Sequence, residues 1–301
     1  MELVNEYNLL VRKENIFGDN IAYVESYDFS KANMSNENRM KAITQIASIC
    51  YANPKAFGSE SLYNRLAAES HSLPSSSFEF VPMLFNYEHL KDDVYALTDV
   101  TIEDTNMLKY GEKVEDGKYL LTNFRAVVYD FENLGIDLRD HFNTEAECQI
   151  IAKHFKVFKM KVDMPTFGQA VRHRINWQVL SRRYVSGSRV PFSFYIAEKM
   201  KNVESYLFNS ISYDGQIDKL STENVINICL EHYKTALETG VKPQVARGII
   251  PQCAYTEAWC AFQPKQFDSF INLRTDSHAQ PEIRLLSKAM LEMSSEPEVM
   301  S

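Results

Sequence analysis

The chain has 301 residues, of which 45% are hydrophobic and 24% charged, and these ordinary globular values exclude a disordered or fibrous protein. The net charge of -8 argues against a general nucleic-acid-binding protein but permits a local basic pocket for a small phosphorylated ligand. The longest apolar runs are far shorter than the roughly 18 residues needed to span a bilayer, and the N-terminal residues lack a signal-peptide pattern. We therefore expect a cytoplasmic protein with one large domain over residues 1–301.

Cysteine and histidine usage points away from a disulfide framework and from a metal site. The five cysteines are scattered without a CxxC pair, and none of the seven histidines belongs to an HExxH pattern. We expect reduced thiols and no metal. The glycines form neither a GxGxxG nor a GxxxxGK pattern, which argues against a Rossmann or P-loop nucleotide site.

The first elements along the chain are predicted to be a helix, a turn and a strand. The apolar stretch 40–51 has helical character, and Asn53-Pro54 should end that helix. Residues 73–77 are turn-like, and the apolar run from Phe78 to Phe85 is typical of a strand. Glu79 would then face water at a sheet edge, unless it belongs to a site.

The segment from about 86 to 150, called here the acidic segment, is rich in Asp and Glu and is interpreted as an insertion in the domain. After it, residues 155–162 alternate polar and apolar side chains, as in a half-buried strand. Ser221 or Thr222 is suited to cap a helix that runs to about Thr239, where Gly240 ends it. Further helices are expected at 242–249, 264–274 and 280–293, the last with Pro281 in its first turn.

The most informative feature is a cluster of four arginines within thirteen residues, formed by Arg172-His173-Arg174 and Arg182-Arg183. Arginine presents a planar fork of donors that matches phosphate or carboxylate, so the cluster indicates a site for an anion. The alternative is a solvated basic helix face. Apolar residues interleaved with the charges favour a partly buried segment, in which an unpaired arginine would be costly.

The cluster, read with two other stretches, resembles the flavin-dependent thymidylate synthases. The family's arginine-histidine-arginine triplet, followed by serine, arginine and tyrosine, is matched from Arg172 to Tyr184. Its C-terminal half is matched at 237–251 and 272–284. A shorter element is matched at Ser76 to Glu79, preceded by a helix at 46–51. The resemblance implies a mixed α/β (α+β) fold, in which a central, mostly antiparallel sheet is flanked by helices and followed by a long helical C-terminal part.

The resemblance also implies an activity. It is the reductive methylation of dUMP to dTMP, with methylenetetrahydrofolate as the one-carbon donor and FAD, reduced by NADPH, as the hydride source. No protein nucleophile takes part in that reaction, so Cys253 is interpreted as a small buried residue rather than as the attacking cysteine of the classical thymidylate synthases. The family further implies a homotetramer whose active sites combine residues of several subunits, with no nucleic acid or membrane as partner.

Residue by residue, the family motifs assign two sets of ligands. Arg274 is the implied catalytic residue, because a guanidinium stabilises negative charge on the deprotonated uracil ring; an ion pair with Asp276 or Glu282 is its alternative role. The implied dUMP-binding residues are Gln169, Arg172, Ser181, Arg182, Arg183, Arg247 and Arg274. The implied FAD-binding residues are Ser76, Glu79, Arg172, His173, Arg174, Gln178, Gln263, Lys265 and Ser269.

Several positions depart from the family pattern. The spacer between Arg174 and Ser181 has six residues, one fewer than in the family. Gln263-Pro264-Lys265 replaces an asparagine and an arginine that contact FAD, and a lysine cannot reproduce an arginine fork. Altered cofactor contacts leave two alternatives open: a variant that 5-hydroxymethylates a pyrimidine nucleotide, and a catalytically impaired nucleotide-binding homologue. An unrelated phosphate-binding α/β protein would require the long C-terminal match to arise by chance.

Overall fold

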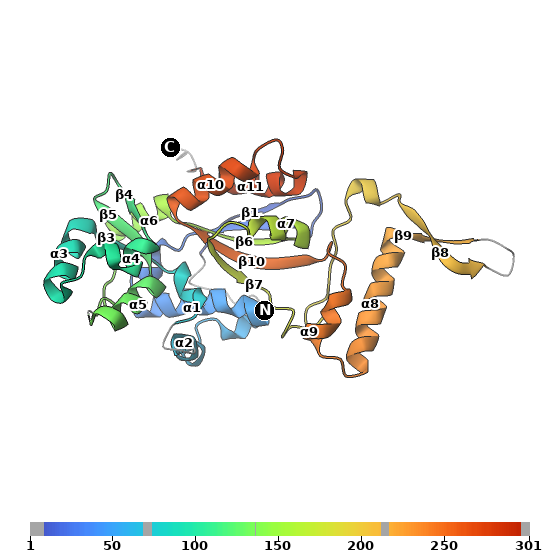
Figure 1. The fold of residues 1–301 in the computed structure, drawn as a ribbon, viewed down its shortest axis with the longest axis horizontal. Helices are drawn as coiled ribbons and strands as arrows, with labels where there is room; N and C mark the ends of the chain where they lie inside the picture. Colours follow the sequence, from blue (N-terminus) through green and yellow to red (C-terminus); the bar gives the residue numbers. More distant parts are fainter. Residues whose placement is uncertain (1–8, 69–73, 136, 212–216, 296–301) are drawn as a thin grey trace.

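A computed structural model describes residues 9–68, 74–135, 137–211 and 217–295. Its centre is a five-stranded sheet in which every neighbouring pair is antiparallel (Figure 1). The strand predicted at 155–162 is present and pairs along its whole length with the buried strand β10. The strands in spatial order are β1 (Leu10–Asn15), β2 (Tyr23–Tyr27), β6 (Lys156–Asp163), β10 (Tyr255–Phe262) and β7 (Asn176–Val179).

Helices cover both faces of this sheet, because alternate residues of its central strands supply two separate cores. Cys260 and Phe262 of β10 belong to one apolar cluster, and Trp259 and Ala261 belong to the other. Figure 1 shows α10 and α11 on one side of the sheet and α1 on the other. These layers confirm the expected mixed fold. The covering helices are α1 (Asn36–Tyr51), α7 (Met164–Ala170), α10 (Pro264–Arg274) and α11 (Pro281–Ser294).

The acidic segment supplies two strands of a second, smaller sheet, whose third strand, β3, comes directly before it, and the helices around that sheet. Its strands lie in the order β3-β5-β4, and their buried residues join the same apolar cluster as helix α1. The interpretation of this segment as an insertion stays a prediction. The elements are β3 (Pro82–Asn86), α3 (Tyr87–Thr98), α4 (Asn106–Lys109), β4 (Glu112–Val114), β5 (Tyr119–Asn123), α5 (Phe124–Leu134) and α6 (Glu145–His154).

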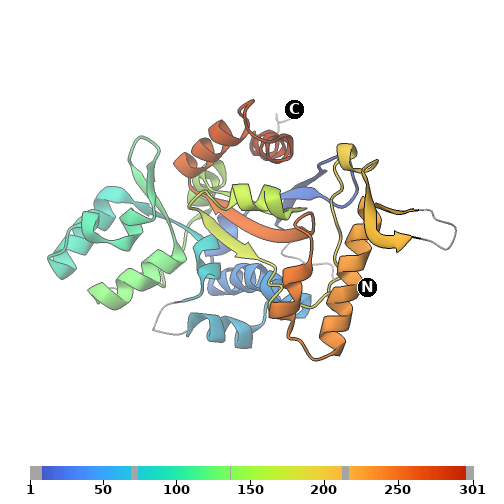
Figure 2. The same cartoon turned by 45° about the vertical axis from the view of Figure 1, so that its right-hand side comes forward.

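Residues 204–211 and 217–246 form an arm at one end of the central sheet (Figures 1 and 2). Ser221 caps α8 by accepting from the backbone N–H of Asn224, and Gly240 follows the helix with a φ of 89°, as predicted. The helix predicted at 242–249 is split into a short α-helix and a 3-10 turn at 247–249. The arm consists of β8 (Glu204–Ile211), β9 (Ile217–Ser221), α8 (Thr222–Glu238) and α9 (Pro243–Ala246).

The helix predicted at 40–51 is confirmed and ends before Asn53-Pro54, but the strand expected from Phe78 was wrong in its first half. Residues 76–80 form a 3-10 turn, and strand β3 begins only at Pro82. Glu79 is therefore not on an edge strand. The remaining helical pieces are α2 (Glu60–Ala67) and 3-10 turns at 30–33, 54–56, 102–104 and 198–200; Leu73 lies outside the described residues.

Within the described ranges, no helix is both long and apolar enough to cross a membrane.

Candidate functional site

The arginine triplet lies where the chain turns from helix α7 into the edge strand β7. Pro165 lies in the first turn of α7, where its fixed φ suits the start of a helix, and the helix ends at Ala170. The Trp177 indole then donates to the His173 carbonyl at 3.2 Å, which ties the strand back to the triplet. Arg172 and Arg174 stand on either side of His173 and line two different pockets.

The first of these, the arginine pocket, has a volume of about 790 Å³ and is formed by α7, residues 179–182 and the segment 247–256. It is lined by five predicted substrate residues: Gln169, Arg172, Ser181, Arg182 and Arg247. Arg183 does not line it and is exposed, with its guanidinium 5.4 Å from the Tyr184 ring. The structure thus brings together most of the predicted dUMP ligands from segments far apart in the chain.

Among the described residues, the charged side chains that line the arginine pocket are all arginines. No aspartate or glutamate lines it within the described residues, and Arg172 and Arg247 are exposed. Arg182 is more constrained, because it donates to the Val190 carbonyl at 2.5 Å and lies 4.1 Å from the Phe192 ring. Burial lowers the pKa of Arg182 from its ordinary value. Uncompensated guanidinium groups at one concave surface favour an anionic ligand.

Arg274, at the last residue of α10, reaches the triplet from the other side. Its Nε donates to His173 Nε2 at 2.9 Å, and its Nη2 donates to the Gln169 carbonyl at 2.8 Å. The accepting Nε2 must carry no proton, so the imidazole is neutral with its proton on Nδ1. Burial and then the Arg274 charge lower the pKa of His173, while burial and then Arg172 lower the pKa of Arg274.

The alternative role of Arg274, an ion pair at helical range, does not occur in the described chain. Asp276 instead accepts from the backbone N–H of His278 at 2.8 Å, and Glu282 accepts from the Tyr195 hydroxyl at 3.3 Å. Both acids are thus engaged elsewhere.

The second pocket, called here the amide pocket, has a volume of about 520 Å³ and is lined by Glu79, Arg174 and Gln263 of the predicted FAD set. Two further predicted residues meet beside it, since Gln178 Nε2 donates to Ser76 Oγ at 3.3 Å. Lys265 and Ser269 do not line this pocket. The Lys265 side chain is 85% exposed, with its ammonium 3.6 Å from Glu112.

Gln263 is the unusual member of the amide pocket. The residue is 6% exposed, and its side chain turns back toward the first turn of α10. Its Oε1 faces the Gln266 N–H in a capping-box arrangement without reaching hydrogen-bond geometry, and Nε2 also makes no hydrogen bond in the described chain. Because burying an unpaired amide costs free energy, such a group is rarely left without a partner. A ligand edge that offers one acceptor and one donor would satisfy it.

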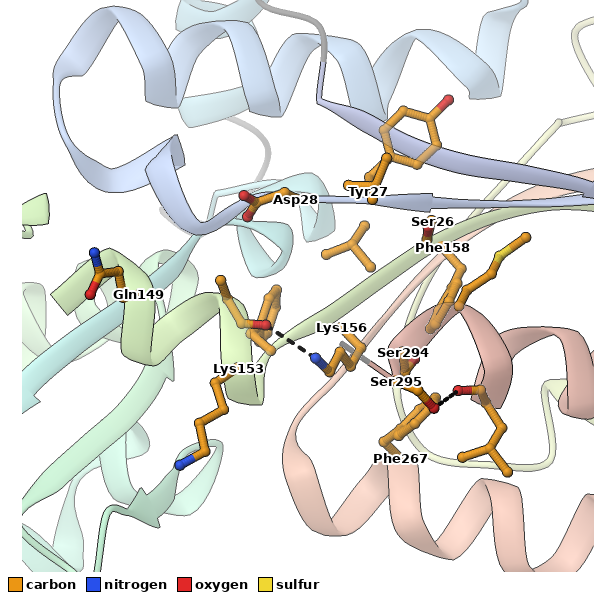
Figure 3. Close-up of a pocket in the computed structure, with 16 residues that line it drawn as sticks. Ser26, Tyr27, Asp28, Gln149, Lys153, Lys156, Phe158, Phe267, Ser294 and Ser295 are labelled. Atoms are coloured by element: carbon orange, nitrogen blue, oxygen red, sulfur yellow. Dashed lines mark hydrogen bonds between the residues drawn. The ribbon is translucent and has the colours of Figure 1, made fainter. Parts of the chain in front are cut away.

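A third cavity, of about 680 Å³, lies between strand β2, helix α6 and the end of α11 (Figure 3). None of the predicted site residues lines it. Two polar side chains at its wall are hydrogen-bonded to backbone carbonyls four residues earlier in the chain. Lys156 Nζ donates to the Ala152 carbonyl at 3.1 Å, and Ser295 Oγ donates to the Leu291 carbonyl at 3.1 Å.

Among the described residues, no group of three or more His, Cys, Asp or Glu could hold a metal ion.

Comparison with known proteins decides the family. The family described as Thy1, thymidylate synthase complementing protein, matches residues 144–297. The chain belongs to this family.

Relatives described as flavin-dependent thymidylate synthase share part of the chain. The protein of Kosmotoga olearia is 31% identical over 148 residues, covering 44% of this chain and 60% of the relative. That of Thermotoga neapolitana is 34% identical over 137 residues, covering 44% and 59%, and that of Aquifex aeolicus is 32% identical over 138 residues, covering 44% and 43%. The chain thus spans at most about 60% of the length of these relatives.

The range matched by the Thy1 family contains the arginine pocket and Arg274 but leaves out Ser76 and Glu79. It also leaves out Arg125, a residue that the sequence analysis missed. Arg125 forms an ion pair with Glu79 and donates from Nε to the Pro74 carbonyl at 2.9 Å. Glu79 is thus partly buried and paired with a cation. Its partner lies 46 residues away, so no local pattern could have indicated the pair.

Cys253 does not line either pocket, although its neighbours Gln252 and Ala254 line the arginine pocket. Burial raises the pKa of its thiol, so the reactive thiolate is disfavoured. Its backbone carbonyl accepts from Tyr195 N–H at 2.8 Å, a contact that anchors the chain. The interpretation of Cys253 as a structural residue is therefore favoured.

Proposed function

We propose that this chain is a flavin-dependent thymidylate synthase, which converts dUMP to dTMP with methylenetetrahydrofolate and NADPH as co-substrates. The observation that carries the proposal is the placement of Arg172 and Arg174, which flank His173, in two pockets, one lined by further arginines and one with an unpaired amide. Membership of the Thy1 family supports it. The relatives above are all described as flavin-dependent thymidylate synthase, which favours methylation over the hydroxymethylating and impaired alternatives.

The arginine pocket suits the nucleotide. Arg172 and Arg247 are exposed cations with no carboxylate beside them in the pocket, so they can bind a phosphate in two-point geometry. Ser181 and Gln169 add neutral polar groups at the same surface. We propose that the phosphate of dUMP binds to these residues and that Arg183, which is exposed and does not line the pocket, contributes only in an assembly of several subunits.

Arg274 suits the base of the nucleotide. Its two bonds use Nε and Nη2, and Nη1 makes no bond within the described chain. A guanidinium that is held in place before the substrate arrives stabilises the negative charge of a deprotonated uracil without further reorganisation. The neutral His173 keeps Arg274 oriented without competing for that charge. The protein supplies no nucleophile in this scheme.

The amide pocket fits a flavin. The unpaired Oε1 and Nε2 of Gln263 match a heterocycle edge that carries both donors and acceptors, and Arg174 supplies a cation for a phosphate. We propose that Gln263, Arg174 and the Ser76–Gln178 pair hold FAD, with Lys265 and Ser269 near its periphery. When bound, the flavin supplies the hydride-transfer chemistry.

We propose a homotetramer with shared active sites. Large apolar side chains near the arginine pocket are exposed and support an interface there: Val245 is 65% exposed, Leu273 56% and Ile249 43%. A cytoplasmic location remains a prediction.

The test is tritium release from 5-labelled dUMP, measured with NADPH and methylenetetrahydrofolate, together with the visible absorption spectrum of the purified protein. We expect a flavin spectrum and co-substrate-dependent release. Arg274→Met should lower turnover by about 100-fold or more, as expected for loss of a charge-stabilising donor. Arg65→Met, which removes an exposed arginine on α2, should leave turnover unchanged. A flavin-loaded protein without tritium release would overturn the proposal.

A further inference from the structure

One wall of the amide pocket is built by the acidic segment, which matches none of the family motifs. Strand β7 and helix α10 form the side with Arg174 and Gln263. The rest of the lining includes the 106–112 turn, with Lys109 and Tyr110, and Arg125 and Tyr129 of helix α5. The acidic segment thus reaches the proposed cofactor site.

A buried carboxylate holds this wall in place. Asp130 is 3% exposed and accepts from the backbone N–H groups of Asn106 at 2.9 Å and Met107 at 2.6 Å, and from the Asn106 side chain at 2.8 Å. These are the N–H groups that the start of a short helix leaves without partners. Asp130 therefore anchors α4 on α5, and the geometry of the turn is set before a ligand binds.

Gly111 makes the turn compact. A Cβ at this position would lie 2.5 Å from the Met107 carbonyl oxygen and 2.8 Å from that of Leu121, so only glycine allows the backbone to approach so closely. The close approach places Lys109 and Tyr110, both exposed, at the pocket rather than in a longer loop.

The charges of the wall point to a phosphate. The Arg125 guanidinium already has partners within the chain, because it forms an ion pair with Glu79 and donates to the Pro74 carbonyl. Lys109 has no carboxylate partner in the described chain, and its ammonium lies 5.2 Å from the Tyr110 ring centroid. Arg174 is also exposed and lines the same pocket. Glu112, at the end of the turn, lines it too, but its carboxylate accepts from the Lys265 backbone N–H at 2.9 Å and lies 3.6 Å from the Lys265 ammonium. Lys109 and Arg174 are thus two cations without a carboxylate partner in the described chain, at a pocket that also contains the unpaired Gln263 amide.

We infer that the 106–112 turn is a cofactor-binding wall and that Lys109 binds a phosphate of the flavin nucleotide, so that the acidic segment selects a phosphorylated flavin over riboflavin. This inference rests on the proposed flavin site. It assigns to the acidic segment a role in specificity, while Gln263 contacts the heterocycle that all flavins share.

The experiment measures the dissociation constants of FAD and riboflavin by quenching of flavin fluorescence, with the full-length protein freed of flavin. Lys109→Met should weaken FAD binding by about 5- to 30-fold, as expected for one charge-assisted contact, and leave riboflavin binding unchanged. The matched control is Lys118→Met, because Lys118 is an exposed lysine of the same segment that does not line the pocket. This control should change neither constant.

The outcomes separate the inference from the proposal on which it rests. If the unmodified protein binds no flavin, the proposed function fails. If it binds FAD but Lys109→Met leaves the FAD constant unchanged, or weakens FAD and riboflavin equally, the role of Lys109 is wrong and the proposed function stands. Because Lys109 is exposed, its replacement should not alter the melting temperature, and a melting curve checks that the variant is folded.

Discussion

Gln263 allows a prediction in which stability and binding change in opposite directions. The residue is 6% exposed and both polar atoms of its amide lack partners in the described chain. An unpaired buried amide costs about 1–3 kcal/mol, so Gln263→Met, which keeps the length of the side chain and removes the amide, should stabilise the flavin-free protein by about 1–2 kcal/mol. For a chain of this size the melting temperature should rise by roughly 1.5–3 °C.

The same substitution should weaken flavin binding. Two hydrogen bonds to the heterocycle would be lost, worth together about 1–3 kcal/mol, which corresponds to about a 5- to 150-fold increase in the dissociation constant of FAD. Thermal unfolding of the flavin-free protein and fluorescence titration with FAD measure the two effects. At the same FAD concentration, FAD should therefore raise the melting temperature of the variant by less than it raises that of the unmodified protein.

Gln266→Met is the matched control, because Gln266 lies three residues further on and lines the same pocket. Its amide is used within the chain: Oε1 accepts from the Gln263 N–H at 2.9 Å, and Nε2 donates to the Arg174 carbonyl at 3.2 Å. This variant should melt at a lower temperature. If Gln263→Met also lowers the melting temperature of the flavin-free protein, the reasoning from the unpaired amide is refuted.

Three further predictions concern charged groups. Burial and the Arg274 charge hold the pKa of His173 below 6.5, so the unfolded chain takes up a proton at a higher pH than the folded chain does. The free energy of unfolding should therefore fall as the pH drops below about 6.5, with no such loss above it. In Arg274→Met, NMR titration should show a higher pKa for His173 that still lies below 6.5, and an unchanged pKa would contradict the contact. Arg39 is fully buried and donates to Asn33 and to two backbone carbonyls, so Arg39→Met should cost about 3 kcal/mol or more in urea unfolding, and a loss under about 1 kcal/mol would count against the bonds. Arg172→Ala should weaken dUMP binding by about 10-fold or more and reduce its salt dependence, as followed by calorimetry at two salt concentrations, whereas equal affinity would remove this residue from the phosphate site.

The ends of several helices could be predicted from the sequence because capping is a local interaction. Ser221 needs only the N–H of Asn224 to start α8, and Gly240 ends the same region with a positive φ that other residues avoid. Pro281 begins α11 for a similar reason, since its fixed φ suits a first turn. All partners lie within a few residues, so residue type and order are sufficient.

The apolar run from Phe78 shows where local pattern fails. Hydrophobicity alone does not separate a strand from a tight turn. Phe78 packs against Tyr63 and Phe124, with ring centroids 5.6 Å away in each case, and this packing accommodates a 3-10 turn in which Glu79 meets Arg125. The prediction was wrong because the deciding contacts come from other elements.

By itself the sequence indicated that the chain is globular, that four arginines fall within residues 172–183 in a pattern typical of an anion site, and that the motifs around them resemble one family. Only the tertiary structure decided that Arg172 and Arg174 line different pockets, that Gln263 is buried without a partner, and that Lys109 lines the same pocket as Gln263. The physical reason is distance along the chain. A residue's type states which bonds it can make, but its actual partners are set by the packing of elements that are remote in sequence.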